Sequence, residues 1–417
     1  MNFTALHRAA GAAPGPLTED LLDAAVLAGA VETDDLDWKA ALPPAKSLPQ
    51  SDFPKDVAAM ANSGGGVIVY GVVESAKAAT KRTDAGALSE SHERSLRSAA
   101  VTAITPPVFG LEVYLLGSPG LQAVVVEVPA SLEGPHLIYK NEYFAAPVRN
   151  NADTVWMKER QVEQMYRARF DERRRAREAL DALYVETSAG RDVAQRAWLI
   201  GVARPVLAHT RDRRSRDEAR ATLAKASQLA LFYANRSGIH PFENVDINNP
   251  RPGLRRWVAA NTATGERSRW KEAWISLHHD GAVAVAVAVG GHRWSSDGYF
   301  EGGQVESSAI EAAIADVMAL VRRGSAGTGN DDYDIRVGIE WSGDGPMTIL
   351  TRDTSNQVYD GASIPVFRYT PVETTIDAAA SDFDYYWSVH DLARDCINQG
   401  GISNVLLIQP PEVDDGE

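Results

Sequence analysis

The sequence predicts an α+β fold, and three patterns support this prediction. Apolar residues recur at helical spacing in several segments, of which residues 158–184 form the longest. Short runs rich in Val and Ile, bounded by Gly, Pro and Asp, predict strands, and several are joined by turns typical of hairpins. The second half of the chain repeats the order of hairpin followed by helix. We therefore expect a mixed β-sheet with packed helices, a long connecting helix and a second α+β region of hairpin–helix units.

The long helix is where we expect the first domain to end. Residues 1–16 are rich in small residues, Pro and Gly, and predict a flexible lead-in. We assign residues 17–170 to a first domain, 171–186 to the connecting helix, 187–408 to a second α+β domain of unassigned role and 409–417 to an acidic tail. A chain of 417 residues is long enough for this arrangement, since domains commonly contain about 100–200 residues.

Composition and charge exclude several classes of protein. With 44% hydrophobic and 24% charged residues, the chain is typical of globular rather than disordered or fibrous proteins. Its net charge of −14 argues against a generally basic DNA-coating protein. The single cysteine, Cys396, excludes an internal disulfide framework and a Cys-based zinc site, and fits a reducing cytosol. The N-terminal segment lacks the apolar core of a signal peptide, and no apolar run is long enough to span a bilayer, so we expect a cytoplasmic protein without membrane contact.

Start and stop signals define the elements expected in the first domain. Thr18 is suited to cap a helix over residues 17–27, and Asp52 and Pro54 open a second helix that ends at Asn62. The fully apolar run of residues 67–72 predicts a buried central strand. The other elements expected here are a strand-like stretch over 31–42, a polar loop over 75–83, a helix over 90–103, a hairpin of strands 111–116 and 121–128, and a last strand over 143–149.

The second region contains apolar residues at helical spacing in some segments and short apolar runs typical of strands in others. Helices are expected over residues 217–233, 307–323 and 381–398. Strands are expected over residues 197–202, 257–260, 273–278 and 282–289, and a further hairpin joins 334–341 to 347–351.

Three acidic residues make up the candidate catalytic site. Glu32 and Asp37 lie five positions apart, and Glu74 comes just after the predicted strand 67–72. If residues 32–39 pair beside that strand, the three carboxylates converge at one end of the sheet, where ligands usually bind. Converging acids repel one another, and Mg²⁺ or Mn²⁺ relieves that repulsion and can activate water against a phosphodiester. The alternative is that Glu32 and Asp37 belong to a solvated acidic turn and that Glu74 is simply exposed after a strand.

Two other features have a structural explanation. Gly64, Gly65 and Gly66 precede a strand, whereas a phosphate-binding loop follows one, so the glycines more simply allow a tight reversal and close backbone approach. His136, which follows Pro135, either contacts a phosphate or has a structural polar role.

Several of these segments together resemble the Schlafen-like AlbA-type domain over residues 30–170. The matching features, in order, are Glu32, Asp37-Trp38-Lys39, the helix ending in Ala61-Asn62-Ser63 with Gly65-Gly66, the strand ending in Gly71-Val72, Pro135-His136, Tyr143, Arg149 and Thr154. In animal Schlafens, similar domains cleave tRNA and rRNA with three acids. The resemblance implies that these acids are Glu32, Asp37 and Glu74, although the family more often has Glu at the second position and Asp at the third. It also has Gly where Asn150 follows Arg149.

The resemblance implies a bacterial-type metal-dependent endoribonuclease that acts on structured RNA such as tRNA, with a role in stress or phage defence by analogy. Glu32, Asp37 and Glu74 would hold Mg²⁺ or Mn²⁺, and either a homodimer or the second region would complete the RNA-binding surface. Residues 1–170 contain 15 basic and 20 acidic residues, a net charge of −5, so any RNA groove must be local. Its expected contacts are Lys39, Lys77, Lys81, Arg82, Lys140 and Arg149.

Two other functions remain open at this point. The first is a non-catalytic regulator that binds nucleic acid on the same fold, for which binding falls with salt and survives chelation. The second is a nucleotide-binding or protein-interaction module, in which the acids are incidental and the basic residues are scattered solubilising charges.

Overall fold

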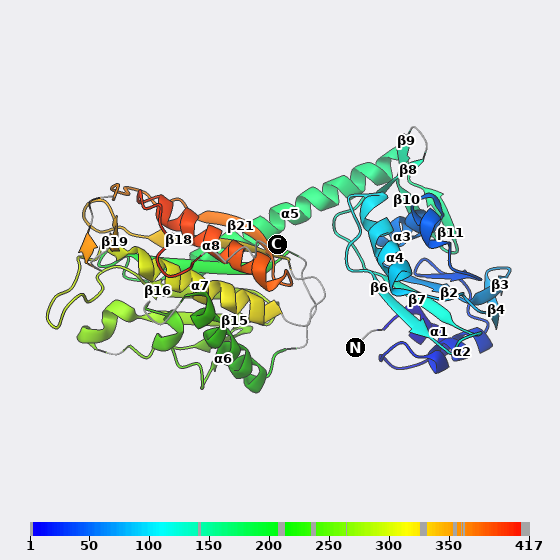
Figure 1. Cartoon of the computed structure of the whole chain (residues 1–417), viewed down its shortest axis with the longest axis horizontal. Helices are drawn as coiled ribbons and strands as arrows, with labels where there is room; N and C mark the ends of the chain where they lie inside the picture. The colour runs from blue at the N-terminus through cyan, green and yellow to red at the C-terminus, as the bar shows by residue number, and fades with distance from the viewer. Residues whose placement is uncertain are drawn as a thin grey trace, which may run out of the picture. The chain divides into compact units, whose positions relative to one another are not determined.

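The computed structural model describes residues 3–140, 143–206, 213–234, 239–263, 265–325, 332–352, 357–359, 361 and 363–409 (Figure 1). The chain divides into two compact units, Met1–Arg174 and Arg175–Glu417, called unit 1 and unit 2 below. Both units combine helices with sheets, so the predicted α+β class is confirmed. In the described part of the chain, every helix is too short or too polar to cross a membrane. The side chain of Lys140 and residues 410–417 of the predicted tail lie outside the described residues.

A four-stranded sheet forms the centre of unit 1. Its order is β1, β2, β7, β6, in which β1 is parallel to β2 and the other neighbours are antiparallel. The strands span Leu36–Lys39 (β1), Gly66–Tyr70 (β2), Glu112–Leu116 (β6) and Ala123–Val128 (β7).

Helices cover both faces of this sheet, which explains the continuous apolar run in β2. Ile68 and Tyr70 pack in one core with α3 (Phe53–Ala61) and α4 (Glu90–Thr102). Val67 and Val69 point to the opposite core, with α1 (Ala5–Ala10) and α2 (Glu19–Leu27). Thr18 accepts a hydrogen bond from Leu21 N, as expected of an N-cap. The segment predicted as a flexible lead-in contains α1, because Leu6 is fully buried against α2.

Small hairpins and a three-stranded sheet complete unit 1. The hairpins pair β3 (Val72–Ser75) with β4 (Ala78–Arg82) and β10 (Pro147–Asn150) with β11 (Asp153–Trp156). The sheet has the order β5 (Ile104–Thr105), β8 (Leu137–Lys140), β9 (Tyr143–Ala145). A 3₁₀ helix spans Ala45–Gln50, and α5 (Glu159–Ser188) contains the boundary between the units.

Gly71 ends the apolar run one residue before the predicted end of the strand. Its φ is +97°, and an added Cβ would lie 2.7 Å from the Gln122 carbonyl oxygen. The chain therefore leaves the central sheet here and enters β3, so Glu74 lies inside a strand of a separate hairpin rather than just after β2. The loop predicted over residues 75–83 is wrong for the same reason, because β4 returns alongside β3.

Unit 2 is built on a seven-stranded antiparallel sheet with the order β13, β14, β15, β16, β12, β18, β21. Its strands span Trp198–Pro205 (β12), Arg251–Gly253 (β13), Arg256–Ala259 (β14), Ala273–His278 (β15), Val283–Ala288 (β16), Asp332–Glu340 (β18) and Val372–Asp377 (β21). Alternation in β16 sends Val283, Val285 and Val287 to one face and the strand's three alanines to the other.

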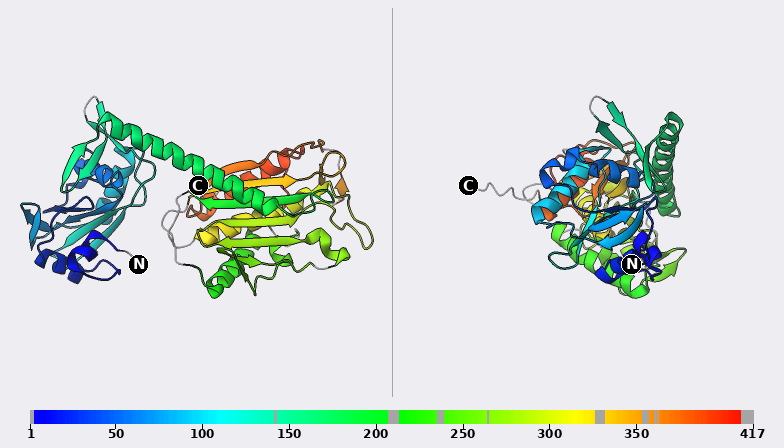
Figure 2. Two further views of the ribbon diagram at one scale, coloured as in Figure 1. Left: turned by 180° about the vertical axis from the view of Figure 1, so that it is seen from behind. Right: turned by 90° about the vertical axis from the view of Figure 1, so that its right-hand side faces the viewer.

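Helices cover both faces of this sheet as well (Figure 2). One face packs against α6 (Arg216–Tyr233), α7 (Ser307–Ser325) and α8 (Asp382–Asn398). Leu180, Leu183 and Tyr184 of α5 pack on the other face. The remaining elements of unit 2 are the 3₁₀ helices Pro241–Asn244 and Glu266–Lys271 and a small sheet of β17 (Gln304–Glu306), β19 (Thr348–Arg352) and β20 (Val358–Tyr359).

The hairpin predicted between residues 334–341 and 347–351 is wrong. β18 already has β12 and β21 on its two edges, so it has no edge left for β19. β19 pairs with β17 and β20 instead.

Candidate functional site

Strand β1 directs two charged side chains toward α3. Asp37 lies opposite Ile68 and Lys39 opposite Tyr70, so the pairing with β2 that the candidate site requires is present. Leu36 and Trp38 point to the opposite core. Because side chains alternate along a strand, Asp37 and Lys39 share the face that packs on α3.

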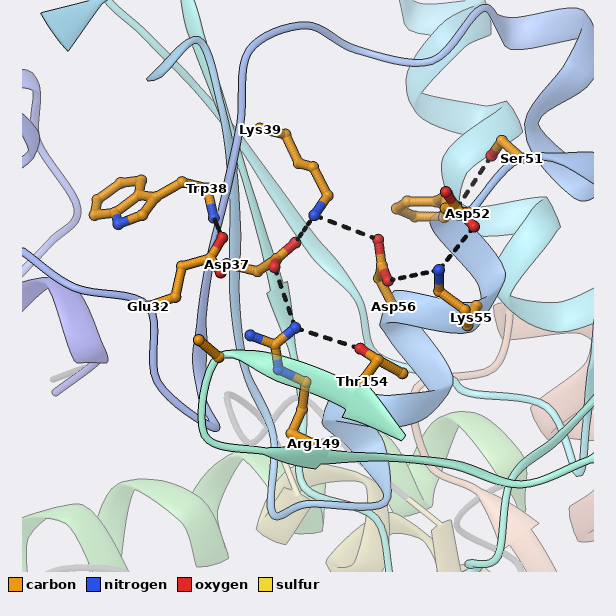
Figure 3. A network of polar contacts seen from close by, with 12 residues as sticks. Glu32, Asp37, Trp38, Lys39, Ser51, Asp52, Lys55, Asp56, Arg149 and Thr154 are labelled. Atoms are coloured by element: carbon orange, nitrogen blue, oxygen red, sulfur yellow. Dashed lines mark hydrogen bonds and ion pairs between the residues drawn. The ribbon is translucent and has the colours of Figure 1, made fainter. Parts of the chain in front are cut away.

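Two cations hold the carboxylate of Asp37, which is 2% exposed (Figure 3). Arg149 Nη1 lies 3.1 Å from Oδ1, and the Lys39 ammonium forms an ion pair with Oδ2. The Arg149 guanidinium also donates to the Thr33 carbonyl oxygen at 3.1 Å and to the Leu36 carbonyl oxygen at 3.4 Å. Arg149 thus fastens the β10–β11 hairpin to β1.

The end of α3 positions the strand that carries Arg149. Ser63 Oγ accepts from the Arg149 backbone N–H at 2.9 Å, and Asn62 Nδ2 donates to the Pro147 carbonyl oxygen at 2.8 Å. The following glycines permit the reversal into β2, since a Cβ on Gly65 would lie 2.7 Å from Ala130 N and one on Gly66 2.7 Å from Asp35. The predicted structural role of these glycines is confirmed.

His136 belongs to the same support rather than to an exposed surface. It is fully buried, and its Nδ1 lies 2.8 Å from the Pro106 carbonyl oxygen. Its backbone N–H donates to Asn62 Oδ1 at 2.7 Å. Burial lowers the pKa of its imidazole, although the bond to Pro106 acts in the opposite direction. His136 therefore links the residue that follows α3, Asn62, to Pro106, which follows β5.

Glu32 is a second buried acid near Asp37, with an exposed fraction of 4%. Its Oε1 accepts from the Trp38 backbone N–H at 3.1 Å, and its Oε2 lies 3.3 Å from Lys77 Nζ. Burial raises the pKa of Glu32; the bond to Trp38 opposes this, and the negative charges of Asp37 and Glu74 add to it. These charges make proton uptake by Glu32 easier than by an exposed glutamate.

Asp56 on α3 is a member of the cluster that the sequence analysis missed. It is 5% exposed and lies 3.7 Å from Lys39 Nζ and 3.9 Å from Lys55 Nζ. Burial raises its pKa to about 6, although the charge of Lys39 acts against this. Burial and the charges of Asp56 and Asp37 also raise the pKa of Tyr70. One signal was present in the sequence: Asp56 lies three residues after Phe53 and four before Met60, on the apolar face of the helix.

The lysine of β1 responds to these acids. Burial alone lowers the pKa of Lys39, but the charges of Asp37 and Asp56 outweigh burial and raise it above the ordinary value. Lys39 remains protonated and its side chain is 35% exposed. We call Glu32, Asp37, Lys39, Asp56, Lys77 and Arg149 the charge cluster.

Glu74 lies outside the charge cluster. It is exposed on β3, and its charge acts on both Glu32 and Lys77. Across the described residues, no group of three or more His, Cys, Asp or Glu side chains is arranged to hold a metal ion. The three-acid catalytic site and its metal stay predictions.

The predicted nucleic-acid contacts differ in exposure. Lys77 is 46% exposed, and Lys81 is exposed on β4. The side chain of Arg82 is 9% exposed and pairs with Asp23 at 2.5 Å, and that of Arg149 is 2% exposed. Lys39, Lys77 and Lys81 are therefore the predicted contacts whose described side chains solvent reaches most easily.

Comparison with protein families identifies part of unit 1. The model of the Schlafen, AlbA_2 family matches residues 32–158. Unit 1 contains a Schlafen AlbA_2 domain. The match includes every member of the charge cluster, and the family indicates a nucleic-acid-binding or nuclease-like domain.

Two solved structures are similar to parts of the chain. The DIP2311 protein from Corynebacterium diphtheriae is 14% identical with a TM-score of 0.24, and the match covers 47% of this chain but only 29% of DIP2311. The N-terminal domain of a putative ATP-dependent DNA helicase RecG-related protein from Nitrosomonas europaea is 20% identical with a TM-score of 0.23. That match covers 31% of this chain and 84% of the domain. A search of curated proteins found no match.

Proposed function

We propose that this protein binds RNA through the Schlafen AlbA_2 domain of unit 1, at the solvent-facing side of the charge cluster. The observation that carries this proposal is the arrangement of Lys39 and Lys77, whose side chains are 35% and 46% exposed and whose ammonium groups contact buried carboxylates. The acids fix both ammonium groups in place, and the exposed parts of the lysines remain open to a phosphate. Exposed Lys81 on the β3–β4 hairpin adds a third positive charge.

The negative charge of the unit confines this binding to a local surface. A phosphate near Lys77 would replace part of its interaction with Glu32 and Asp153, whose oxygens lie 3.3 and 3.6 Å from Nζ. The raised pKa of Glu32 eases that exchange, because Glu32 can take up a proton when Lys77 turns away. Binding should therefore weaken steeply with salt.

Metal-dependent endoribonuclease activity is a second candidate. It is favoured by the negative charges of Asp37 and Glu74, which add to burial in raising the pKa of Glu32, since carboxylate oxygens are the ligands that Mg²⁺ and Mn²⁺ prefer. As placed, however, these residues do not fit a bound cation, because both oxygens of Asp37 contact protein cations and Glu74 is exposed. We derive no catalytic step through a metal from this arrangement. The ion pairs favour RNA binding without cleavage.

One assay separates these functions. Purified full-length protein is mixed with fluorescently labelled total tRNA at several salt concentrations, with Mn²⁺ or with chelator. RNA binding predicts a complex that survives chelation and falls with salt. Absence of any complex at low salt would overturn the proposed function.

Cleavage is read from the same samples on a denaturing gel. The endoribonuclease candidate predicts fragments with Mn²⁺ that disappear with chelator and in the Glu32→Gln and Glu74→Gln variants. Fragments that persist equally in both variants would remove these acids from catalysis. Intact tRNA under every condition would exclude the endoribonuclease candidate and leave RNA binding without cleavage as the function.

A further inference from the structure

The β8–β9 hairpin of unit 1 carries aromatic rings that the unit leaves exposed. Tyr139, Tyr143 and Phe144 are 74%, 58% and 60% exposed, whereas neighbouring Ile138 is buried in the core. In Figures 1 and 2 the hairpin projects at the edge of the unit. Single exposed apolar residues are common on protein surfaces, but a group of large ones usually marks a binding site.

The pairing of the strands arranges these rings on both faces of the hairpin. Tyr139 lies directly opposite Phe144, so the two side chains share one face. Their ring centroids are 6.2 Å apart with an angle of 54° between the ring planes. Tyr143 lies opposite Lys140 and points to the other face. Each face therefore offers ring surface to an incoming planar group.

The hairpin is continuous with the charge cluster. The chain passes from β9 through Ala146 into β10, which pairs with β11. At the far end of β10 and β11, Lys77 Nζ lies 3.2 Å from the Ala152 carbonyl oxygen and 3.6 Å from Asp153. Exposed Trp156 lies opposite Pro147, at the end of the hairpin that follows β9. Exposed Asn150 lies opposite Asp153, which contacts Lys77. The seven steps along the chain from Phe144 to Asn151 span at most about 25 Å, a length comparable to a few nucleotides.

We infer that the β8–β9 and β10–β11 hairpins together bind unpaired nucleotides, whose bases stack on Tyr139, Phe144 and Tyr143 while the nucleic-acid backbone runs toward Lys77. The inference rests on the proposed RNA binding and specifies which part of the RNA the domain recognises. Every base has a flat face that can stack on an aromatic ring, so the contact tolerates any sequence. Bases within a duplex are already stacked and cannot make this contact.

The neighbouring charge favours a nucleic acid over a protein partner. Lys77, toward which the chain leads from these rings, is 46% exposed, and lysine is depleted at protein interfaces. β9 is an edge strand of only three residues, which gives an added peptide strand few backbone hydrogen bonds.

The test measures binding of full-length protein to labelled 12-nucleotide oligouridylate, 12-nucleotide oligothymidylate and a 12-base-pair RNA duplex by fluorescence anisotropy. The Tyr139→Ala/Phe144→Ala double variant should bind both single strands at least tenfold more weakly and the duplex within twofold of wild type. Equal losses for the two single strands are expected if the rings contact the bases, and a loss confined to oligouridylate would contradict base stacking as the source of the affinity.

Two matched variants control for indirect effects. Tyr139→Phe/Phe144→Tyr keeps both rings and should bind like wild type. Phe109→Ala removes a ring that is 67% exposed in the same unit but is not part of either hairpin, and should also bind like wild type.

The possible outcomes separate this inference from the proposed function. If wild type binds neither single strands nor tRNA, both fail. If wild type binds and the double alanine variant binds single strands equally well, the stacking surface is overturned while RNA binding stands. If light scattering shows a wild-type dimer that the double variant loses, with single-strand affinity unchanged, the hairpin is an interface between copies of the chain and the inference is wrong.

Discussion

Both units bury carboxylates, but the groups that compensate those charges differ. In unit 2, Asp316 is fully buried beside His240 Nδ1 at 2.6 Å and accepts from Phe242 N at 2.8 Å. Glu311, also fully buried, accepts from the backbone N–H groups of Leu406 and Leu407 at 2.9 and 2.6 Å. In unit 1, the charge cluster uses lysines that solvent reaches.

This difference shows that the partner of a buried acid, more than its burial, distinguishes a structural role from a position at a binding surface. Backbone N–H groups inside a core cannot leave, so Asp316 and Glu311 fasten one segment to another. A half-exposed ammonium group can turn toward a phosphate. This contrast supports the proposal that unit 1 binds RNA, and we expect mutations in the two units to act on different properties.

The largest effect is expected from removing the buried arginine of the charge cluster. Arg149→Ala leaves Asp37 buried with one cation fewer and should destabilise unit 1 by about 3–5 kcal/mol. Denaturant unfolding of the full chain followed by fluorescence measures this loss. Arg173→Ala is the control, because its side chain is 55% exposed and its ion pair with Glu133 should contribute little. A loss of less than about 1 kcal/mol for Arg149→Ala would contradict the assigned role.

In unit 2, Asp316→Ala removes the carboxylate from His240 and the Phe242 N–H. We expect a loss of about 3 kcal/mol without any change in RNA affinity, because a buried donor without its acceptor is costly. Asp217→Ala, at a side chain that is 83% exposed, should change stability by less than about 0.5 kcal/mol. Weakened RNA binding by folded Asp316→Ala protein would show that the units do not act separately.

Asp56 should make the stability of unit 1 depend on pH. Burial raises its pKa from 3.8 to about 6 in the folded protein; the charges of Lys39 and Lys55 oppose this shift, and those of Asp37 and Asp52 add to it. The folded state therefore binds more protons than the unfolded state between these values, so stability falls as pH rises through that window. The fall should be roughly 2–3 kcal/mol and should be complete above pH 7.

Asp56→Asn tests this pH dependence directly. Unfolding experiments at several pH values between 4 and 7 should give a flatter profile for the variant, with only the contribution of Glu32 remaining from this cluster. Profiles of equal slope would show that Asp56 is not the group that titrates.

The smallest effect on stability is expected at Lys77, where the effect on binding should be clear. Lys77→Ala should change the free energy of unfolding by less than about 1 kcal/mol, because the side chain is 46% exposed and buried Glu32, whose pKa is raised, can take up a proton once the lysine is removed. Its affinity for tRNA should fall severalfold, and the slope of log affinity against log salt should decrease by about one. Lys46→Ala, at another exposed lysine of unit 1, is the matched control. Equal effects of the two substitutions would remove Lys77 from the binding surface.

Local patterns predicted much of the fold because local physics controls those elements. The apolar face and opening residues of α3 were sufficient to place it, and the β-branched run identified β2. The hairpin of β6 and β7 followed from its Gly-Ser-Pro-Gly turn. The position of β4 was missed because its polar residues lie in a small exposed hairpin that no hydrophobic pattern reveals.

The candidate site was only partly predictable. From the sequence, the pairing of residues 32–39 with the central strand was only a condition, and the parallel pairing of β1 with β2 meets it. The sequence missed Asp56 and the burial of Arg149, since both depend on which helix and which hairpin pack over β1. Glu74 was placed after β2, whereas Gly71 diverts the chain into a separate hairpin.

The sequence by itself determined the α+β class, the main helices and the charged residues near the central strand, because spacing and turn residues act over a few positions. Only the tertiary structure decided the partners of those charges. Arg149 reaches Asp37 from 112 positions away, and Lys77 reaches Glu32 from another hairpin. Whether a carboxylate is left open for a ligand or already neutralised by the chain depends on such distant contacts, and these form only when the sheet, helices and hairpins have packed together.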